Sequence, residues 1–145
     1  MITMERTVTT AASPDAVFAY LSDFTTAAQW DPNAVEVVRT TGDGGVGTVY
    51  RVTSKFAGRT TELDYCVVDL EQTSLIRLVG EKKSITAVDT ITIGSDDAGT
   101  HVTYAVEFSF HGPLRLAEPL LKFAVADLFK SGAIGLSEAL DRPTV

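Results

Sequence analysis

The stretch PLRLAEPLLKFAVADLFKSGAIGLSEAL, residues 113–140, decides the fold of this chain. Its apolar residues recur at three- and four-residue spacing, which predicts one long amphipathic helix. The residues near one side are Leu114, Leu121, Ala124, Val125, Leu128, Gly132, Leu136 and Ala139, and Leu120, Phe123 and Phe129 broaden that stripe. Pro119 predicts a kink or break, so the continuous helix is expected to begin near residue 119. Gly132 and Gly135 each lower intrinsic helix stability by about 1 kcal/mol relative to alanine, so packing must stabilise the helix.

The chain before this helix reads mainly as strands. Residues 100–110 are the clearest case, because apolar and polar residues alternate there with period two. The other expected strands are residues 4–10, 34–41, 47–56, 60–70, 75–81 and 85–93. Two short helices are expected after the first strand: Ser13 and Pro14 begin one, and Asp31-Pro32 ends the other, which spans 24–30. A run of antiparallel strands with segregated helices predicts a single α+β domain over residues 1–145.

Length and composition limit the function. A chain of 145 residues with 45% hydrophobic and 21% charged residues is typical of one soluble domain that can enclose a pocket. The net charge of −7 and the scattered basic residues argue against nucleic acid as a partner. No apolar run is long enough to span a bilayer, and the start lacks the features of a secretory signal. With the single cysteine Cys66, these features favour a cytoplasmic location.

Several segments resemble one known superfamily. They are residues 13–23 (SPDAVFAYLSD), Trp30-Asp31-Pro32, Val46-Gly47-Thr48 and residues 99–104 (GTHVTY). Over roughly residues 4–141 the chain resembles the START-like, or Bet v 1-like, superfamily, in the branch labelled polyketide cyclase/dehydrase and lipid transport (SRPBCC). The resemblance implies a helix-grip fold, in which a curved seven-stranded antiparallel sheet wraps around the long C-terminal helix. It also implies a hydrophobic cavity for lipids, sterols, polyketides, quinones or other apolar molecules, and some members catalyse aromatisation or cyclisation.

Strand parity selects the residues that face such a cavity. Tyr50 and Val52 on one strand, Leu63, Tyr65 and Val67 on the next, and Val102, Tyr104, Val106 and Phe108 on the last share inward faces. Each of these is either plain core or pocket wall, and the tyrosine hydroxyls either orient a ligand or reach solvent at the rim. The residues predicted to bind the ligand are Trp30, Tyr50, Val52, Tyr65, Asp89, Ile91, Tyr104, Phe108, Leu120, Phe123, Ala124 and Leu128.

Asp89 stands out because it shares the inward parity of Ile85, Ala87, Ile91 and Ile93. A buried carboxylate is costly unless it is paired, and burial raises its pKa. Asp89 therefore either pairs with Arg77 on the adjacent strand, lies near a sheet edge, or serves as a polar anchor or general acid/base in the pocket.

Arg77 is either a surface residue or an interior cation, and Trp30 is either a packing residue or a pocket wall near the entrance. Asp89, Arg77 and Tyr104 are the candidates for catalysis. His101 and His111 are expected to face solvent, and with Cys66 they show no metal spacing, so no metal or cofactor is expected.

These residues favour a carrier or binding protein for an apolar small molecule. A cyclase, aromatase or dehydratase that acts in the same cavity is the alternative. A third possibility is an accessory protein that works through its surface. Ligand access is expected to require movement of the loops near Trp30 and Ala57-Gly58 against the terminal helix. The oligomeric state is not readable from the sequence.

Overall fold

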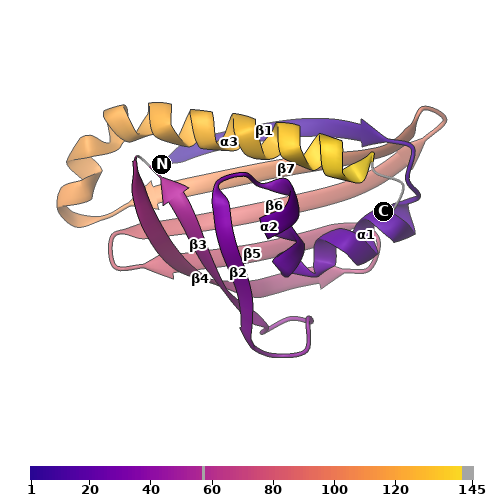
Figure 1. Ribbon diagram of the computed structural model, residues 1–145, viewed down its shortest axis with the longest axis horizontal. Coiled ribbons are helices and arrows are strands. Elements are labelled where there is room, and N and C mark those ends of the chain that lie inside the picture. The colour runs from indigo at the N-terminus through magenta and orange to yellow at the C-terminus, as the bar shows by residue number, and fades with distance from the viewer. Residues whose placement is uncertain (57, 142–145) are drawn as a thin grey trace.

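The protein is described by a computed structural model that covers residues 1–56 and 58–141 (Figure 1). Its elements follow the order β1 (Ile2–Thr10), α1 (Pro14–Ser22), the 3₁₀ turn η1 (Phe24–Thr26), α2 (Ala27–Trp30), β2 (Ala34–Thr41), β3 (Val49–Phe56), β4 (Arg59–Glu71), β5 (Leu75–Lys82), β6 (Ile85–Asp96), β7 (Gly99–Phe110), η2 (Gly112–Ala117) and α3 (Glu118–Leu140). The seven strands and the short helices expected from the sequence are therefore confirmed, with ends shifted by a few residues.

The seven strands form one antiparallel sheet in the order β1-β7-β6-β5-β4-β3-β2. Register shifts in β2 and in β4, between Val67 and Asp69, mark irregularities that bend the strands and support the curvature. In Figure 1, α3 lies across the concave side along β1 and β7, while β2 and β3 curl forward around that side. This arrangement confirms the predicted α+β helix-grip fold.

The segment between β1 and β2 closes one end of the concave side. The hydroxyl of Ser13 accepts a hydrogen bond from the amide of Ala16 at 3.2 Å, and Pro14 follows it in the first turn of α1. Asp23 caps η1 in the same way through the amide of Thr25. These caps fix the direction of the chain so that Phe24 and Trp30 both point into the core, where they are 5% and 3% exposed.

Helix α3 begins at Glu118, so Pro119 lies in its first turn, as its position in the sequence predicted. Its buried side chains all come from Val125 onward and pack on β1, α2 and the sheet. Between Gly112 and Ala124 no residue is buried. Leu114 and Leu121 are half-buried against the core at the start of this segment, and fully buried residues follow only from Val125 onward.

Gly135 explains why α3 can approach α2 so closely. A Cβ atom at this position would lie 1.7 Å from the carbonyl oxygen of Trp30, which no packing adjustment short of moving a backbone could accept. The helix therefore needs glycine here for contact with α2, not for flexibility. This contact offsets the low helix propensity that the sequence indicated.

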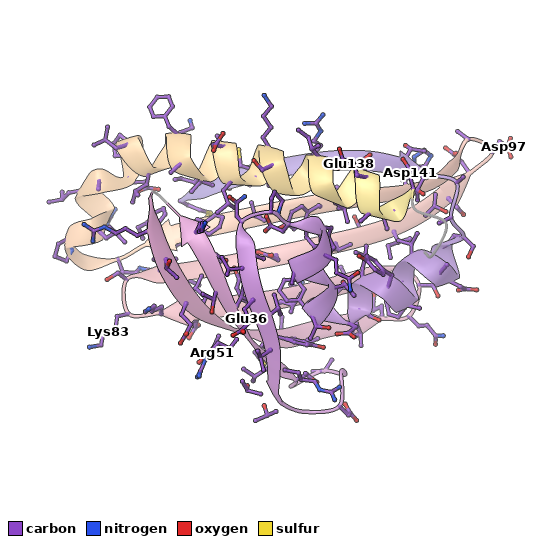
Figure 2. All side chains as sticks on the ribbon, in the orientation of Figure 1. Glu36, Arg51, Lys83, Asp97, Glu138 and Asp141 are labelled. Atoms are coloured by element: carbon purple, nitrogen blue, oxygen red, sulfur yellow. The ribbon has the colours of Figure 1, made fainter. Side chains whose placement is uncertain are left out.

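Most of the charged side chains lie at the periphery. Figure 2 labels Glu36 and Arg51 on the outside of β2 and β3, Lys83 and Asp97 at the β5–β6 and β6–β7 hairpins, and Glu138 on α3. All five are exposed, so the concave side remains mainly apolar. Within residues 1–56 and 58–141, no helix has the combined length and apolarity needed to cross a bilayer.

Candidate functional site

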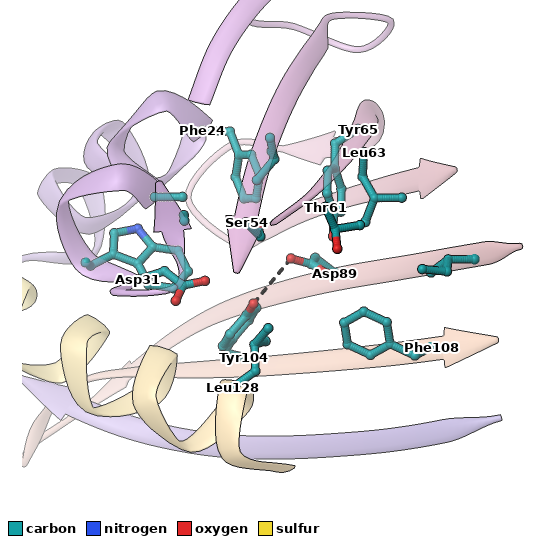
Figure 3. A pocket seen from close by; sticks show the side chains of 15 residues that line it. Phe24, Asp31, Ser54, Thr61, Leu63, Tyr65, Asp89, Tyr104, Phe108 and Leu128 are labelled. Atoms are coloured by element: carbon teal, nitrogen blue, oxygen red, sulfur yellow. Dashed lines mark hydrogen bonds between the residues drawn. The ribbon is translucent and has the colours of Figure 1, made fainter. Parts of the chain in front are cut away.

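A cavity lies on the concave side, between α2, the central strands and α3 (Figure 3). Its described lining residues are Phe24, Ala27, Trp30, Asp31, Ala34, Val52, Ser54, Thr61, Leu63, Tyr65, Ile85, Asp89, Tyr104, Phe108 and Leu128. Within the cavity, a volume of about 50 Å³ is accessible to the centre of a water molecule. That space holds a few small groups, whereas pockets for drug-sized ligands occupy roughly 300–1,000 Å³. The sheet and helix are therefore held apart, but only slightly.

Aromatic rings form two walls of this cavity. On one side the ring of Trp30 meets the ring of Tyr104 edge to face at 5.5 Å, and Tyr104 stacks on Phe129 of α3 at 5.4 Å. On the other side Phe24 packs against Tyr65 at 5.6 Å. Tyr65 has room because Gly80 lies opposite it on β5, where any Cβ atom would come within 2.8 Å of the ring. Rings packed in this way shape the cavity with little loss of side-chain entropy on binding.

Asp89 points into the cavity from β6, in the middle of this apolar wall. It is 4% exposed, and its neighbours across the sheet are Leu78 and Val106. The hydroxyl of Tyr104 donates a hydrogen bond to Oδ2 at 3.3 Å, drawn as the dashed line in Figure 3. Its second oxygen, Oδ1, is buried and has no hydrogen-bond partner among the described residues. Asp89 is thus a buried carboxyl group with only one of its two oxygens hydrogen-bonded within the described part of the chain.

Burial raises the pKa of Asp89 from 3.8 to about 7. The hydrogen bond from Tyr104 opposes that rise, and the nearby charge of Asp31 adds to it. Burial also raises the pKa of Asp31, against two hydrogen bonds that its Oδ1 accepts from Asn33 at 2.9 and 3.3 Å. The cavity therefore contains two acidic groups, and Asp89 can exchange its proton near neutral pH.

The sequence and the fold of the chain were compared with known proteins. The sequence model described as "Polyketide cyclase / dehydrase and lipid transport" matches residues 1–141. The chain belongs to this family. No curated protein matches the chain at a significant level. The family assignment agrees with the resemblance found in the sequence and confirms it.

Solved structures similar to this family member share the fold at low sequence identity. A START superfamily protein of Mycobacterium smegmatis is 16% identical, with a TM-score of 0.78 over 95% of this chain and 96% of that one. The Zhui aromatase/cyclase of Streptomyces sp. R1128 is 18% identical, with a TM-score of 0.77 over 95% of this chain and 90% of that one. The major latex-like protein 151 of Panax ginseng is 10% identical, with a TM-score of 0.72 over 97% of both chains. At these identities the similarity shows the helix-grip fold alone.

The structure brings together seven of the residues predicted to bind a ligand in this family member. These are Trp30, Val52, Tyr65, Asp89, Tyr104, Phe108 and Leu128. Tyr50 and Ile91 are buried and share the inward parity of the lining residues Val52 and Asp89, but they do not line the cavity; Tyr50 packs on Phe24 with ring centroids 5.8 Å apart. Ala124 is half-buried on α3 and is not part of the wall.

Leu120 and Phe123 were predicted to contact the ligand, but both lie on the surface and away from the cavity. Leu120 and Phe123 are 75% and 76% exposed on the outer side of α3. In the first turns of the helix only the side of Leu121 packs against the core, so Leu120 and Phe123 on the other side face solvent despite their apolar character. With Leu116, which is 88% exposed, they form an apolar stripe on the surface.

Arg77 is also excluded from the cavity, both as an interior cation and as a partner of Asp89. It pairs with Thr90 across the sheet, whereas Asp89 is opposite Leu78, so the two side chains leave opposite faces. On the outer face Arg77 donates to Asp69 Oδ2 at 2.9 Å. The predicted pairing with Asp89 therefore fails because the two residues differ by one in register.

Asp31 is the lining residue with chemistry that the sequence reasoning missed. In the sequence, Asp31 marks the end of a helix and belongs to the segment Trp30-Asp31-Pro32 that carries the family resemblance. Asp31-Pro32 was the available signal, because an aspartate side chain can fix a turn by accepting from the backbone amide two residues on, here that of Asn33. Asn33 also donates to the carbonyl of Leu128 at 3.2 Å, which ties this turn to α3 and turns Asp31 toward the cavity.

A second, larger hollow lies on the surface. The centre of a water molecule can reach a volume of about 680 Å³ in it. Its lining residues are Met1, Ile2, Thr3, Arg115, Leu116, Glu118, Pro119 and Lys122. It is an open groove with charged walls at the start of α3. We place the candidate site in the smaller cavity because it is the more enclosed of the two, has aromatic walls and is lined by the residues with unsatisfied polar groups.

The described residues contain no group of three or more His, Cys, Asp or Glu side chains arranged to hold a metal ion. His101 contacts Thr9 and Asp96, and His111 contacts Thr86. Neither histidine lines the cavity, so the acid/base groups of the site are carboxyl and phenol groups.

Replacing Tyr104 with phenylalanine is expected to destabilise the protein more at alkaline than at acidic pH. The variant loses a buried hydrogen bond, worth about 1 kcal/mol to a neutral carboxyl group and about 2 kcal/mol to a carboxylate. Urea unfolding at pH 5 and pH 8 measures both values. Tyr65→Phe removes a second buried phenol that makes no hydrogen bond to Asp89 in the described contacts. A Tyr104→Phe effect that is equal at both pH values would contradict the role given to this hydroxyl.

Proposed function

We propose that this protein binds an apolar small molecule in the cavity and acts as a carrier or binding protein. The observation that carries the proposal is the composition of the cavity wall. Aromatic and aliphatic side chains make up most of it, and they surround a few polar groups, among them Asp89 and the hydroxyl of Tyr104. Burial of the apolar body of the ligand supplies the affinity, at roughly 25 cal/mol per Å² before ordering costs. The family assignment supports a ligand-binding fold and leaves the ligand open.

A lipid-sized or polyketide-sized ligand requires the cavity to widen. The loop at Trp30 was expected to move, but its carbonyl oxygen packs against Gly135 in the middle of α3. Ala57, in the other expected gate, lies outside the described residues. The segment 112–124 has no fully buried side chain, although Leu114 and Leu121 are half-buried against the core, so moving it exposes little of the core. Displacement of this segment from the sheet is therefore our proposal for ligand entry.

A second function is favoured by one observation, the pKa of about 7 for Asp89. A general acid or base works best when its pKa lies near the ambient pH. In a cyclase, aromatase or dehydratase reaction, Asp89 would move a proton to or from a carbonyl substrate in the same cavity. Asp89→Asn separates the two functions: loss of turnover with retained ligand affinity indicates an enzyme, and unchanged turnover and affinity remove Asp89 from both.

Filling the cavity is the direct test of the binding proposal. Ala34 lines the cavity and is 7% exposed, so Ala34→Leu adds three carbons to the wall. We expect gentle native mass spectrometry to show an apolar molecule bound to the wild-type protein and at least tenfold less of it on the variant. Leu116→Ser, in the surface groove, is the control and should retain the ligand. Equal retention by Ala34→Leu, or loss in Leu116→Ser alone, would contradict binding in the cavity.

A further inference from the structure

Two residues that line the cavity each carry a buried polar atom that has no partner among the described residues. These atoms are the indole nitrogen Nε1 of Trp30 and the Oδ1 oxygen of Asp89, both buried from solvent. The two residues flank Tyr104: Trp30 packs on its ring, and Asp89 accepts from its hydroxyl. Buried polar groups without partners are rare in folded proteins because they forfeit hydrogen bonds with water. Two such atoms on residues that line one cavity indicate that a ligand supplies the missing partners.

The charges in the wall limit which ligands can do so. Asp31 and Asp89 both line the cavity, and none of the described lining residues is lysine, arginine or histidine. Arg77, on the strand next to Asp89, is directed to the outer face and pairs with Asp69. A ligand carboxylate or phosphate would meet two acidic groups without a compensating cation. Free fatty acids and phosphorylated lipids are therefore poor matches for this cavity.

Hydrogen-bond chemistry narrows the choice further. The Trp30 nitrogen is a donor only, so the ligand must provide an acceptor. An ammonium group has three donors and no acceptor, and so leaves Trp30 unsatisfied. An ether or ketone accepts from Trp30 but cannot donate to Asp89 in its ionised form, which prevails above its pKa of about 7. A hydroxyl group both accepts and donates, so it offers the two kinds of hydrogen bond that Trp30 and Asp89 lack without introducing charge.

We propose that the ligand of this cavity is an apolar alcohol or phenol, whose uncharged hydroxyl groups accept from Trp30 Nε1 and donate to Asp89 Oδ1. This inference rests on the proposed function, because it assigns the polar end of the ligand that the cavity is proposed to bind. It excludes anionic amphiphiles as the preferred ligands.

Four probes with one ring system test it: 2-naphthalenemethanol, its methyl ether, 2-naphthoate and 2-naphthylmethylammonium. Calorimetry at pH 7.5 is expected to show the alcohol binding about tenfold tighter than the ether and the ammonium ion, with naphthoate weakest. Trp30 is the single tryptophan of the chain, so its indole N–H gives one tryptophan side-chain cross-peak in a ¹H–¹⁵N spectrum. The alcohol should move that cross-peak downfield.

A variant locates the donated hydrogen bond. Asp89→Val should bring the alcohol-to-ether affinity ratio to about one, whereas Thr61→Val, which removes a hydroxyl from the same wall, should preserve the ratio. If Asp89→Val does not fold, the affinities of the wild-type protein for the four probes and the shift of the Trp30 indole cross-peak still test the hydroxyl assignment.

Each outcome separates the inference from the proposed function. Naphthoate or the ammonium ion binding as tightly as the alcohol, or an unchanged ratio in Asp89→Val, would overturn the hydroxyl assignment and leave an apolar cavity in place. If none of the four probes binds, the proposed function fails together with the assignment.

Discussion

Asp89→Asn is expected to remove a pH-dependent loss of stability of roughly 4 kcal/mol between pH 4 and pH 8. In the unfolded chain the carboxyl group of Asp89 ionises near its ordinary pKa of 3.8, but in the folded protein burial keeps it protonated up to about pH 7. Between these values the folded state binds more protons than the unfolded state, so the free energy of unfolding falls as the pH rises. Above pH 7 both states are ionised and the loss is complete. Asparagine does not titrate, so the variant lacks this slope.

Urea unfolding of both proteins from pH 4 to pH 8 measures this effect. The stability of the variant relative to wild type should rise by roughly 4 kcal/mol across the range, although its amide needs a partner of its own at every pH. The difference between the two curves isolates Asp89 from all other titrating groups. Asp69→Asn, on the outer face, controls for the loss of one negative charge. Parallel curves for wild type and Asp89→Asn would show that the carboxyl group is not buried as described.

Gly135→Ala is expected to destabilise the protein by about 3 kcal/mol and to lower its Tm by about 10 °C. The added methyl group would lie 1.7 Å from the carbonyl oxygen of Trp30, so α3 or the α2 turn must move. The higher helix propensity of alanine offsets about 1 kcal/mol of that strain. Because Trp30 and Asp31 line the cavity, the same displacement should also weaken ligand binding. Thermal unfolding followed by circular dichroism measures the change in Tm.

Gly132 provides a matched control one turn earlier in α3. A Cβ atom there would come no closer than 3.6 Å to the side chain of Asp31, which is an ordinary contact. Gly132→Ala should therefore stabilise the protein by up to about 1 kcal/mol, in the opposite direction. Equal effects of the two substitutions would contradict the close contact between α3 and Trp30.

The secondary structure and the inward face of the sheet could be predicted from the sequence. Strand alternation placed Tyr65, Tyr104 and Phe108 on one face, and Ser13 with Pro14 marked the start of α1. These features depend on local rules, namely the period of two in strands and the unsatisfied amides at a helix start. The inward direction of Asp89 followed from the same parity.

The remaining features depend on tertiary position. The period of α3 could not show that its residues are fully buried only from Val125 onward, so the prediction placed Leu120 and Phe123 inward. Strand β5 is apolar on both faces, and this concealed which face carries Arg77. The close contact of Gly135 with Trp30, like the small volume of the cavity, arises from how α3 docks and has no local pattern in the sequence.

The unsatisfied carboxyl group of Asp89 also lowers the stability of the folded protein. A buried acid with one unpartnered oxygen destabilises the folded state above neutral pH, and a valine or leucine at position 89 would avoid this. Local features that weaken a fold without structural benefit are typical of functional sites. This supports assigning the function of the chain to the cavity around Asp89, although the surface groove is larger.

The position of bound 2-naphthalenemethanol decides between the cavity around Asp89 and the surface groove. Intermolecular NOEs from 2-naphthalenemethanol to the isotope-labelled protein report which side chains lie next to the ring. We predict NOEs to Val52, Tyr104, Phe108 and Leu128, which line the cavity. NOEs confined to Met1, Leu116 and Pro119 in the surface groove would contradict a ligand site between the sheet and α3.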